Sequence, residues 1–97
     1  MPRYVTPYKF TDQGVRAVKD SPNRLRTGIE AAERMGIKVI SALYTQGQYD
    51  LVVVSEAPSD EVAVSFNLAI AAQGNVRPET MRAYNAEEFT ALLSRTG

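Results

Sequence analysis

Two neighbouring apolar segments, residues 37–46 and 49–56, constrain the fold of this chain more than any other feature of its sequence. Both segments are rich in β-branched and aromatic residues, which predicts two strands. Only Gly47 and Gln48 separate them, and glycine in the first position of a two-residue loop is typical of a type II′ turn. We therefore expect these segments to form an antiparallel hairpin.

The register of this hairpin determines what each of its faces presents, because side chains alternate between the faces of a strand. A two-residue loop pairs Tyr44 with Leu51 and Ala42 with Val53 on one face, and Leu43 with Val52 and Ser41 with Val54 on the other. Both faces are substantially apolar, whereas the helices of a two-layer chain cover only one. Each uncovered Val or Leu forgoes roughly 1.5–3 kcal/mol. We therefore expect a second copy to cover the other face, giving a homodimer or a multiple of dimers.

Capping residues and helix stops divide the rest of the chain into further elements. Thr11, Ser59 and Asn85 are typical N-caps, and Gly36 and Gly74 are typical of helix ends. The predicted elements are a strand over 3–10, a helical turn over 11–18, a helix over 21–35, the hairpin strands, a helix over 59–73, a strand over 76–84 and a helix over 86–95. This order indicates one domain over residues 1–97 of the α+β class. Its arrangement is the ferredoxin-like βαββαβ one, an antiparallel sheet with helices on one face.

Two prolines test the predicted strand order. Pro78 falls in the strand over 76–84, which lies at a sheet edge in this topology and tolerates proline. Pro7 falls in the strand over 3–10, which is central. Because proline has no N–H to donate, we expect a bulge or a lost ladder bond at Pro7.

The helix over 59–73 is apolar nearly all round. Val62, Phe66 and Ile70, with Ala63 and Ala69, form the stripe expected to face the core, and Val64, Leu68, Ala71 and Ala72 form a second stripe. The second stripe has two interpretations: contacts beyond the dimer, or alanines tolerated on a surface helix.

The composition excludes several classes of function. The chain has no cysteine and no histidine, so we expect no zinc finger, iron–sulfur cluster, metal site or bound cofactor. Eleven basic residues balance eleven acidic ones, which argues against nucleic acid as a partner. No apolar run reaches membrane-spanning length and the first ten residues are too polar for a signal peptide, so we expect no membrane partner and a cytoplasmic location.

Four segments carry a resemblance to a known family: the opening MPRYV (1–5), TDQGVRAVKDSPNR (11–24), GQYDLVVVSEAP (47–58) and GNVRPETMRAY (74–84). They resemble the GYD-domain family, small bacterial and archaeal proteins named for a Gly-x-Tyr-Asp motif, here Gly47, Tyr49 and Asp50. The resemblance implies a ferredoxin-like fold of the dimeric α+β barrel kind. It implies no reaction and supplies no catalytic residues.

Four residues are candidates for ligand binding. Tyr49 and Asp50 follow the hairpin turn and could orient a small ligand at the mouth of a cavity, or could serve only the turn, as Gly47 does. Arg82 could bind a carboxylate or phosphate, or could only protect a sheet edge. Tyr44, with other strand tyrosines, could line an aromatic pocket or pack in a dimer.

Two functions remain open at this level, and the sequence does not decide whether the protein is an enzyme. The first is a module that binds a small molecule or another protein. The alternative is a cofactor-independent monooxygenase or isomerase acting on a small aromatic or enolic substrate. Pocket volume separates them, because an enzyme for a drug-sized aromatic needs about 300 Å³ or more.

Overall fold

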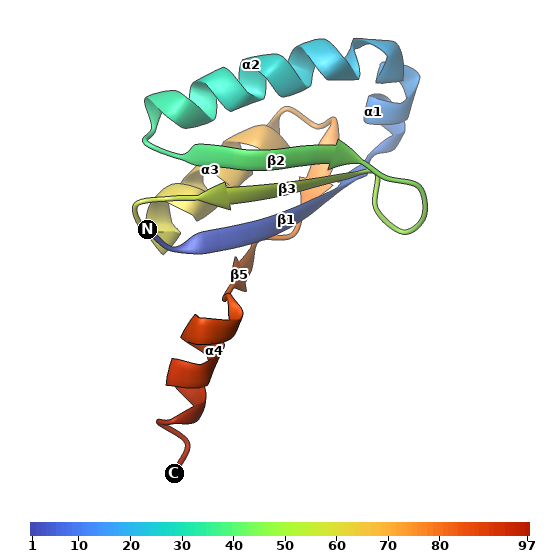
Figure 1. The fold of residues 1–97 in the computed structure, drawn as a ribbon. Helices are drawn as coiled ribbons and strands as arrows, with labels where there is room; N and C mark the ends of the chain where they lie inside the picture. Colours follow the sequence, from blue (N-terminus) through green and yellow to red (C-terminus); the bar gives the residue numbers. More distant parts are fainter.

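A five-stranded antiparallel sheet forms one layer of the protein, and helices cover one of its faces (Figure 1). The computed structural model describes all residues, 1–97. In chain order the elements are β1 (Arg3–Phe10), α1 (Asp12–Arg16), the 3₁₀ turn η1 (Val18–Asp20), α2 (Ser21–Arg34), β2 (Lys38–Tyr44), β3 (Leu51–Glu56), α3 (Asp60–Ala72), β4 (Val76–Pro78), β5 (Met81–Ala83) and α4 (Ala86–Leu93). The strand order is β2-β3-β1-β4, with β5 also paired to β1. The predicted α+β class and ferredoxin-like arrangement are confirmed.

The predicted helix boundaries follow local chemistry. The Thr11 hydroxyl accepts a hydrogen bond from the first turn of α1, and the Ser59 hydroxyl accepts one from the first turn of α3. Asn85 and Glu88 form a reciprocal capping box at the start of α4. Gly36 and Gly74 end α2 and α3 with φ of +82° and +87°, a conformation that favours glycine. All three caps and both stops were predicted from the sequence.

The strand predicted over 76–84 is two short strands, β4 and β5, which both pair with β1. They are separated at Glu79 and Thr80, opposite Pro7. The Pro7 carbonyl accepts from the Glu79 amide at 2.9 Å, so the side of Pro7 that lacks a donor faces this break. On its other side Pro7 stays in register with Val52 of β3. The sheet therefore lacks the backbone hydrogen bond that Pro7 cannot donate, as expected. The edge strand is split into β4 and β5 at this point.

The hairpin between β2 and β3 has the predicted register near its loop but a different turn. Tyr44 pairs with Leu51 and Ala42 with Val53, as expected, and a bulge at Ile40 shifts the register beyond. The predicted two-residue turn is wrong, because residues 45–50 form the connection between β2 and β3. Asp50 hydrogen-bonds on both sides: its carbonyl accepts from the Thr45 amide at 2.9 Å, and its amide donates to the Tyr8 carbonyl of β1 at 2.9 Å.

The core lies between α2, α3 and one face of the sheet. Tyr4 and Tyr8 of β1 and Leu51 and Val53 of β3 are its buried strand residues. From α3, Val62, Phe66 and Ile70 pack against the core as predicted, together with the buried Ala63, whereas Ala69 is exposed. The stripe of Val64 and Leu68 faces away from the sheet and is exposed.

The other face of the sheet carries no helix, and we call it the open face (Figure 1). The strand register shows which side chains lie on the open face, because they alternate with the buried strand residues. The apolar ones are Val5, Leu43, Val52, Val54 and Met81. Leu43 is 65% exposed and Met81 is 45% exposed. Both faces of the hairpin are thus apolar in the folded chain, as the sequence indicates, and the dimer expected from this pattern stays a prediction.

Candidate functional site

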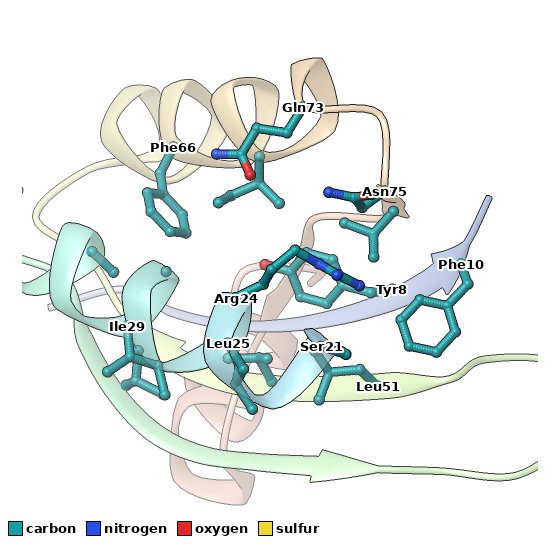
Figure 2. Close-up of a pocket in the computed structure, with 16 residues that line it drawn as sticks. Tyr8, Phe10, Ser21, Arg24, Leu25, Ile29, Leu51, Phe66, Gln73 and Asn75 are labelled. Carbon is teal, nitrogen blue, oxygen red and sulfur yellow. The ribbon is translucent and has the colours of Figure 1, made fainter. Parts of the chain in front are cut away.

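A cavity of about 90 Å³ lies between α2, α3 and the helix-covered face of the sheet (Figure 2). Eleven of its sixteen lining residues are hydrophobic. Leu25, Gly28 and Ile29 line it from α2, and Phe66 and Ile70 line it from α3. Gly28 contributes to the space because it has no side chain. The interior of this cavity therefore suits an apolar group.

Polar residues gather at one end of the cavity, where α2 begins and α3 ends. Ser21, Arg24, Gln73 and Asn75 line this end, and the Arg24 side chain extends across it (Figure 2). Arg24 Nη1 donates to the Ala17 carbonyl at 2.8 Å and lies 4.0 Å from an Asp20 carboxylate oxygen. Arg24 Nη2 is buried and has no hydrogen-bond partner. A buried charged donor without a partner is costly, so Arg24 Nη2 is an unsatisfied donor beside the polar end of the cavity.

A chain of polar groups leads from Tyr8, which lines the cavity, through the buried Asn67 to Thr80 at the surface. The Tyr8 hydroxyl donates to Asn67 Oδ1 at 2.8 Å, and Asn67 Nδ2 donates to the Thr80 hydroxyl at 2.9 Å. Burial raises the pKa of Tyr8 to about 12. Tyr8 is therefore neutral at physiological pH, and its proton is already engaged by Asn67. It holds α3 against β1 and is poorly suited to be a catalytic acid or base.

Asp50 of the predicted site has a structural contact. Its Oδ2 accepts from the Phe10 amide at 2.8 Å, and its carbonyl accepts from the Thr45 amide at 2.9 Å. The carboxylate thereby continues the hydrogen-bonding ladder of β1 beyond the end of β3. Asp50 does not line the cavity, although its partner Phe10 does.

The other two motif residues lie in the connection between β2 and β3, and neither has a side chain that hydrogen-bonds within it. The Tyr49 hydroxyl donates to Glu79 Oε2 at 3.0 Å, and this bond raises the pKa of Tyr49. Gly47 has φ of +130°, and nothing lies within 4 Å of the position that a Cβ would take. Only its backbone conformation therefore calls for glycine. Neither residue lines the cavity.

Arg82 and Tyr44 lie in different surroundings. The Arg82 guanidinium stacks 4.7 Å from the Tyr84 ring centre, donates to the Ala83 carbonyl at 2.9 Å and lies 3.9 Å from Asp60. It is outside the cavity. The Tyr44 hydroxyl hydrogen-bonds Ser21 Oγ at 2.9 Å and so touches the polar end of the cavity. The four predicted residues therefore do not form one site, and their ligand-binding role stays a prediction.

Sequence reasoning missed Arg24 as a cavity residue. Its position held a signal, because Arg24 lies four residues before Gly28 and next to Leu25, at the margin of the apolar stripe of α2. The contacts of Arg24 Nη1 with Ala17 and Asp20 depend on the path of η1, which the sequence did not predict. No group of three or more acidic side chains gathers where a metal ion could be held. No helix is long and apolar enough to cross a membrane.

A single antiparallel sheet with helices on one face and a small cavity between the layers defines a minimal α+β domain. A family profile described as the GYD domain matches residues 4–93, so the chain belongs to the GYD domain family. This confirms the resemblance carried by the Gly47, Tyr49 and Asp50 motif. Comparisons with curated proteins and with solved structures found no match.

Proposed function

We propose that this protein is a binding module for a small carboxylate with a short apolar body, held in the cavity between α2, α3 and the sheet. The observation that carries the proposal is the buried, unpartnered Nη2 of Arg24 at the polar end of an otherwise apolar cavity. A guanidinium matches the planar geometry of a carboxylate, and an apolar cavity wall suits the rest of such a molecule.

The charge balance around Arg24 favours an anion. Asp20 is its nearest carboxylate, at 4.0 Å from Nη1, and that side chain is largely exposed. An ion pair with one exposed partner at this distance gives little net stabilisation. A ligand carboxylate on Nη2 would form a charge-assisted hydrogen bond in a less hydrated place, which contributes roughly 1.5–3 kcal/mol.

The size of the cavity limits the ligand. Its volume of about 90 Å³ is far below the roughly 300 Å³ at which pockets for drug-sized ligands begin. A short aliphatic carboxylate such as isovalerate, with its branched end inside and its carboxylate at the polar end, therefore fits the proposal better than a multi-ring compound does. The alternative, an enzyme for a drug-sized aromatic, needs about 300 Å³ and has no comparable observation in its favour.

Binding of isovalerate tests the proposal, with isovaleramide as the uncharged analogue. Two-dimensional NMR titrations should show saturable shifts of cavity residues such as Gly28 and Ile70 with isovalerate, and weaker or no binding with isovaleramide. Arg24→Gln should weaken isovalerate binding by about tenfold or more, because the charge-assisted bond is lost.

Two variants give the matched controls. Arg26→Gln removes an exposed charge from the same helix outside the cavity, so affinity should stay within about twofold. Arg82→Gln removes the arginine that the sequence suggested. Loss of binding with Arg82→Gln but not with Arg24→Gln would transfer the site to β5, and absence of saturable shifts with isovalerate would refute the proposal.

A further inference from the structure

The single chain exposes more surface than a compact protein of its mass. Its accessible area is 6441 Å², whereas a folded monomer of this mass exposes about 5,500 Å². Its radius of gyration is 14.5 Å, against about 12.5 Å for a compact domain of this length. The excess of about 900 Å² is close to the roughly 800 Å² that each partner buries in a standard protein–protein interface.

Part of this excess belongs to α4, which projects away from the sheet (Figure 1). Phe89, Leu92 and Leu93 repeat at helical spacing and form one apolar side of α4. Phe89 and Leu93 are each 54% exposed. An isolated helix of eight residues is not stable in water, and packing of an apolar side normally supplies its stability. The helix therefore requires a surface that its own chain does not provide in this arrangement.

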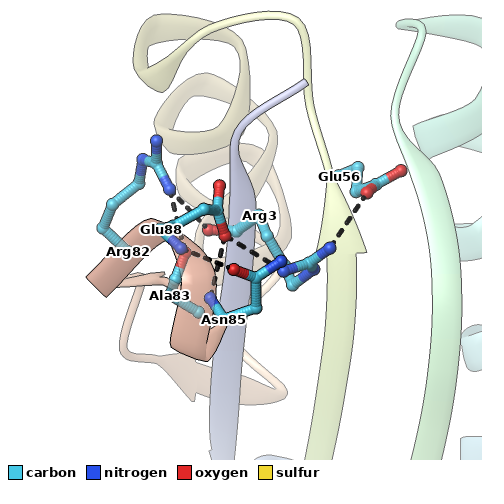
Figure 3. A network of polar contacts seen from close by, with 6 residues as sticks. All are labelled: Arg3, Glu56, Arg82, Ala83, Asn85 and Glu88. Atoms are coloured by element: carbon cyan, nitrogen blue, oxygen red, sulfur yellow. Dashed lines mark hydrogen bonds and ion pairs between the residues drawn. The ribbon is translucent and has the colours of Figure 1, made fainter. Parts of the chain in front are cut away.

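A polar cluster fixes the direction in which α4 leaves the domain (Figure 3). Arg3 of β1 lies 3.6 Å from a Glu56 carboxylate oxygen and 3.3 Å from a Glu88 one. Glu88 also accepts from the Asn85 amide at 2.8 Å within the capping box. Arg3 shares the open face with Val5, since they are two residues apart on one strand. The first turn of α4 is therefore tied to the open-face side of the sheet.

The apolar surface that α4 lacks is present at the opposite edge of the same sheet. β2 is the free edge strand there, and it carries the exposed Leu43 and Ile40. An uncovered apolar edge strand invites association, and natural proteins often cover it with a helix. Three strand spacings, about 14 Å, separate β2 from β5, where α4 begins. In Figure 1 the arm points away from the β2 edge of its own sheet, so a second copy can present that edge to it.

The two apolar faces of the hairpin already predict a two-fold dimer, and we propose that in this dimer the α4 arm of each copy packs over the open face of the other, at the β2 edge around Leu43. The two-fold symmetry makes both contacts equivalent, so each arm and each edge is covered once. The proposal concerns a surface on the far side of the sheet from the cavity and does not depend on a ligand.

Sedimentation velocity of the full chain and of three variants tests the proposal. Leu43→Glu places a charge on the open face, and Phe89→Glu places one on the arm. Leu68→Glu is the matched control, because Leu68 on the outer side of α3 is 64% exposed and Leu43 is 65% exposed. The wild type and Leu68→Glu should be dimeric. Leu43→Glu and Phe89→Glu should each raise the dissociation constant about thirty-fold or more.

The remaining outcomes would overturn the proposal. A monomeric wild type at high micromolar concentration would remove the dimer. Dissociation by Leu68→Glu alone would place the interface on the helices. Dissociation by Leu43→Glu with no effect of Phe89→Glu would leave a sheet contact without the arm. Circular dichroism of each variant separates dissociation from unfolding, since none of the three side chains lies in the buried core.

Discussion

The carboxylate of Asp50 takes the place of a backbone carbonyl in the sheet. It accepts from the Phe10 amide at 2.8 Å, where β3 has already ended and β1 continues. Tyr49 and Gly47 shape the loop that brings this carboxylate to β1. These contacts favour the interpretation that the family motif closes the hairpin end of the sheet.

Asp50→Ala tests this structural role. It leaves the Phe10 amide without an acceptor, and we expect the free energy of unfolding to fall by about 1.5–3 kcal/mol. Asp50→Asn retains a side-chain oxygen in the same place, so its loss should be clearly smaller. Urea denaturation followed by circular dichroism measures both, and equal losses would show that the acceptor is not what matters.

Tyr8 makes the stability of the fold sensitive to alkaline pH. Burial raises its pKa to about 12, whereas tyrosine in an unfolded chain titrates near 10. Below pH 10 both states are protonated and the stabilisation is complete. Between pH 10 and 12 the unfolded chain loses the proton first, so the free energy of unfolding falls with pH, by roughly 3 kcal/mol in total.

Tyr8→Phe isolates this contribution. The variant should be less stable at neutral pH, because Asn67 loses its hydrogen-bond donor, and its stability should decline less steeply between pH 10 and 12. Some decline remains, since the pKa of Tyr4 is also raised, first by burial and then by its hydrogen bond to Asp60. Parallel pH profiles of the two proteins would show that Tyr8 is not the group that titrates.

At the scale of elements, two helical glycines predict opposite effects of the same substitution. A Cβ on Gly28 of α2 would lie 3.9 Å from Ile70 Cδ1, an ordinary contact, whereas a Cβ on Gly14 of α1 would collide with the Asn75 carbonyl. Gly28→Ala should stabilise the protein by about 0.5–1 kcal/mol, because alanine favours the helix. Gly14→Ala should destabilise it by about 1–3 kcal/mol, because the Asn75 carbonyl must move.

Thermal unfolding of both variants measures whether Gly28→Ala raises the stability and Gly14→Ala lowers it. The Asn75 carbonyl also accepts from the Thr11 amide at 3.1 Å, so moving it weakens the start of α1 as well. If Gly14→Ala leaves the melting temperature unchanged, α1 and the segment after α3 separate readily. Gly28→Ala also narrows the cavity and should weaken any isovalerate binding.

The elements also show which parts of the structure a sequence can predict. Helix caps and stops depend on neighbouring residues, so Thr11, Ser59 and Gly36 were correctly assigned. The break between β4 and β5 depends on Pro7, some 70 residues earlier, and was expected only as an irregularity in β1. The buried Asn67 and the unpartnered Arg24 depend on side chains from other elements. The pattern of residues within one element does not predict which side chains from distant elements will contact it.

At the scale of the whole molecule, the fold is apolar on both faces of its sheet but has helices on only one. The cavity and the polar chain of Tyr8 and Asn67 lie on the helix-covered side, and the exposed Leu43 lies on the other. The proposed ligand site and the proposed dimer contact therefore lie on separate surfaces. Substitutions on the open face should leave isovalerate binding intact, provided that the monomer stays folded.

If the dimer contributes to stability, the melting temperature must depend on protein concentration. Dimerisation stabilises the folded state by mass action, so each tenfold rise in concentration should raise the melting temperature of the wild type by roughly 3 °C. Leu43→Glu should melt lower and show no such dependence, because it lacks the partner's arm. Leu68→Glu should keep it. Differential scanning calorimetry over a wide concentration range measures this, and a concentration-independent wild type would mean that each chain is stable with its arm and open face uncovered.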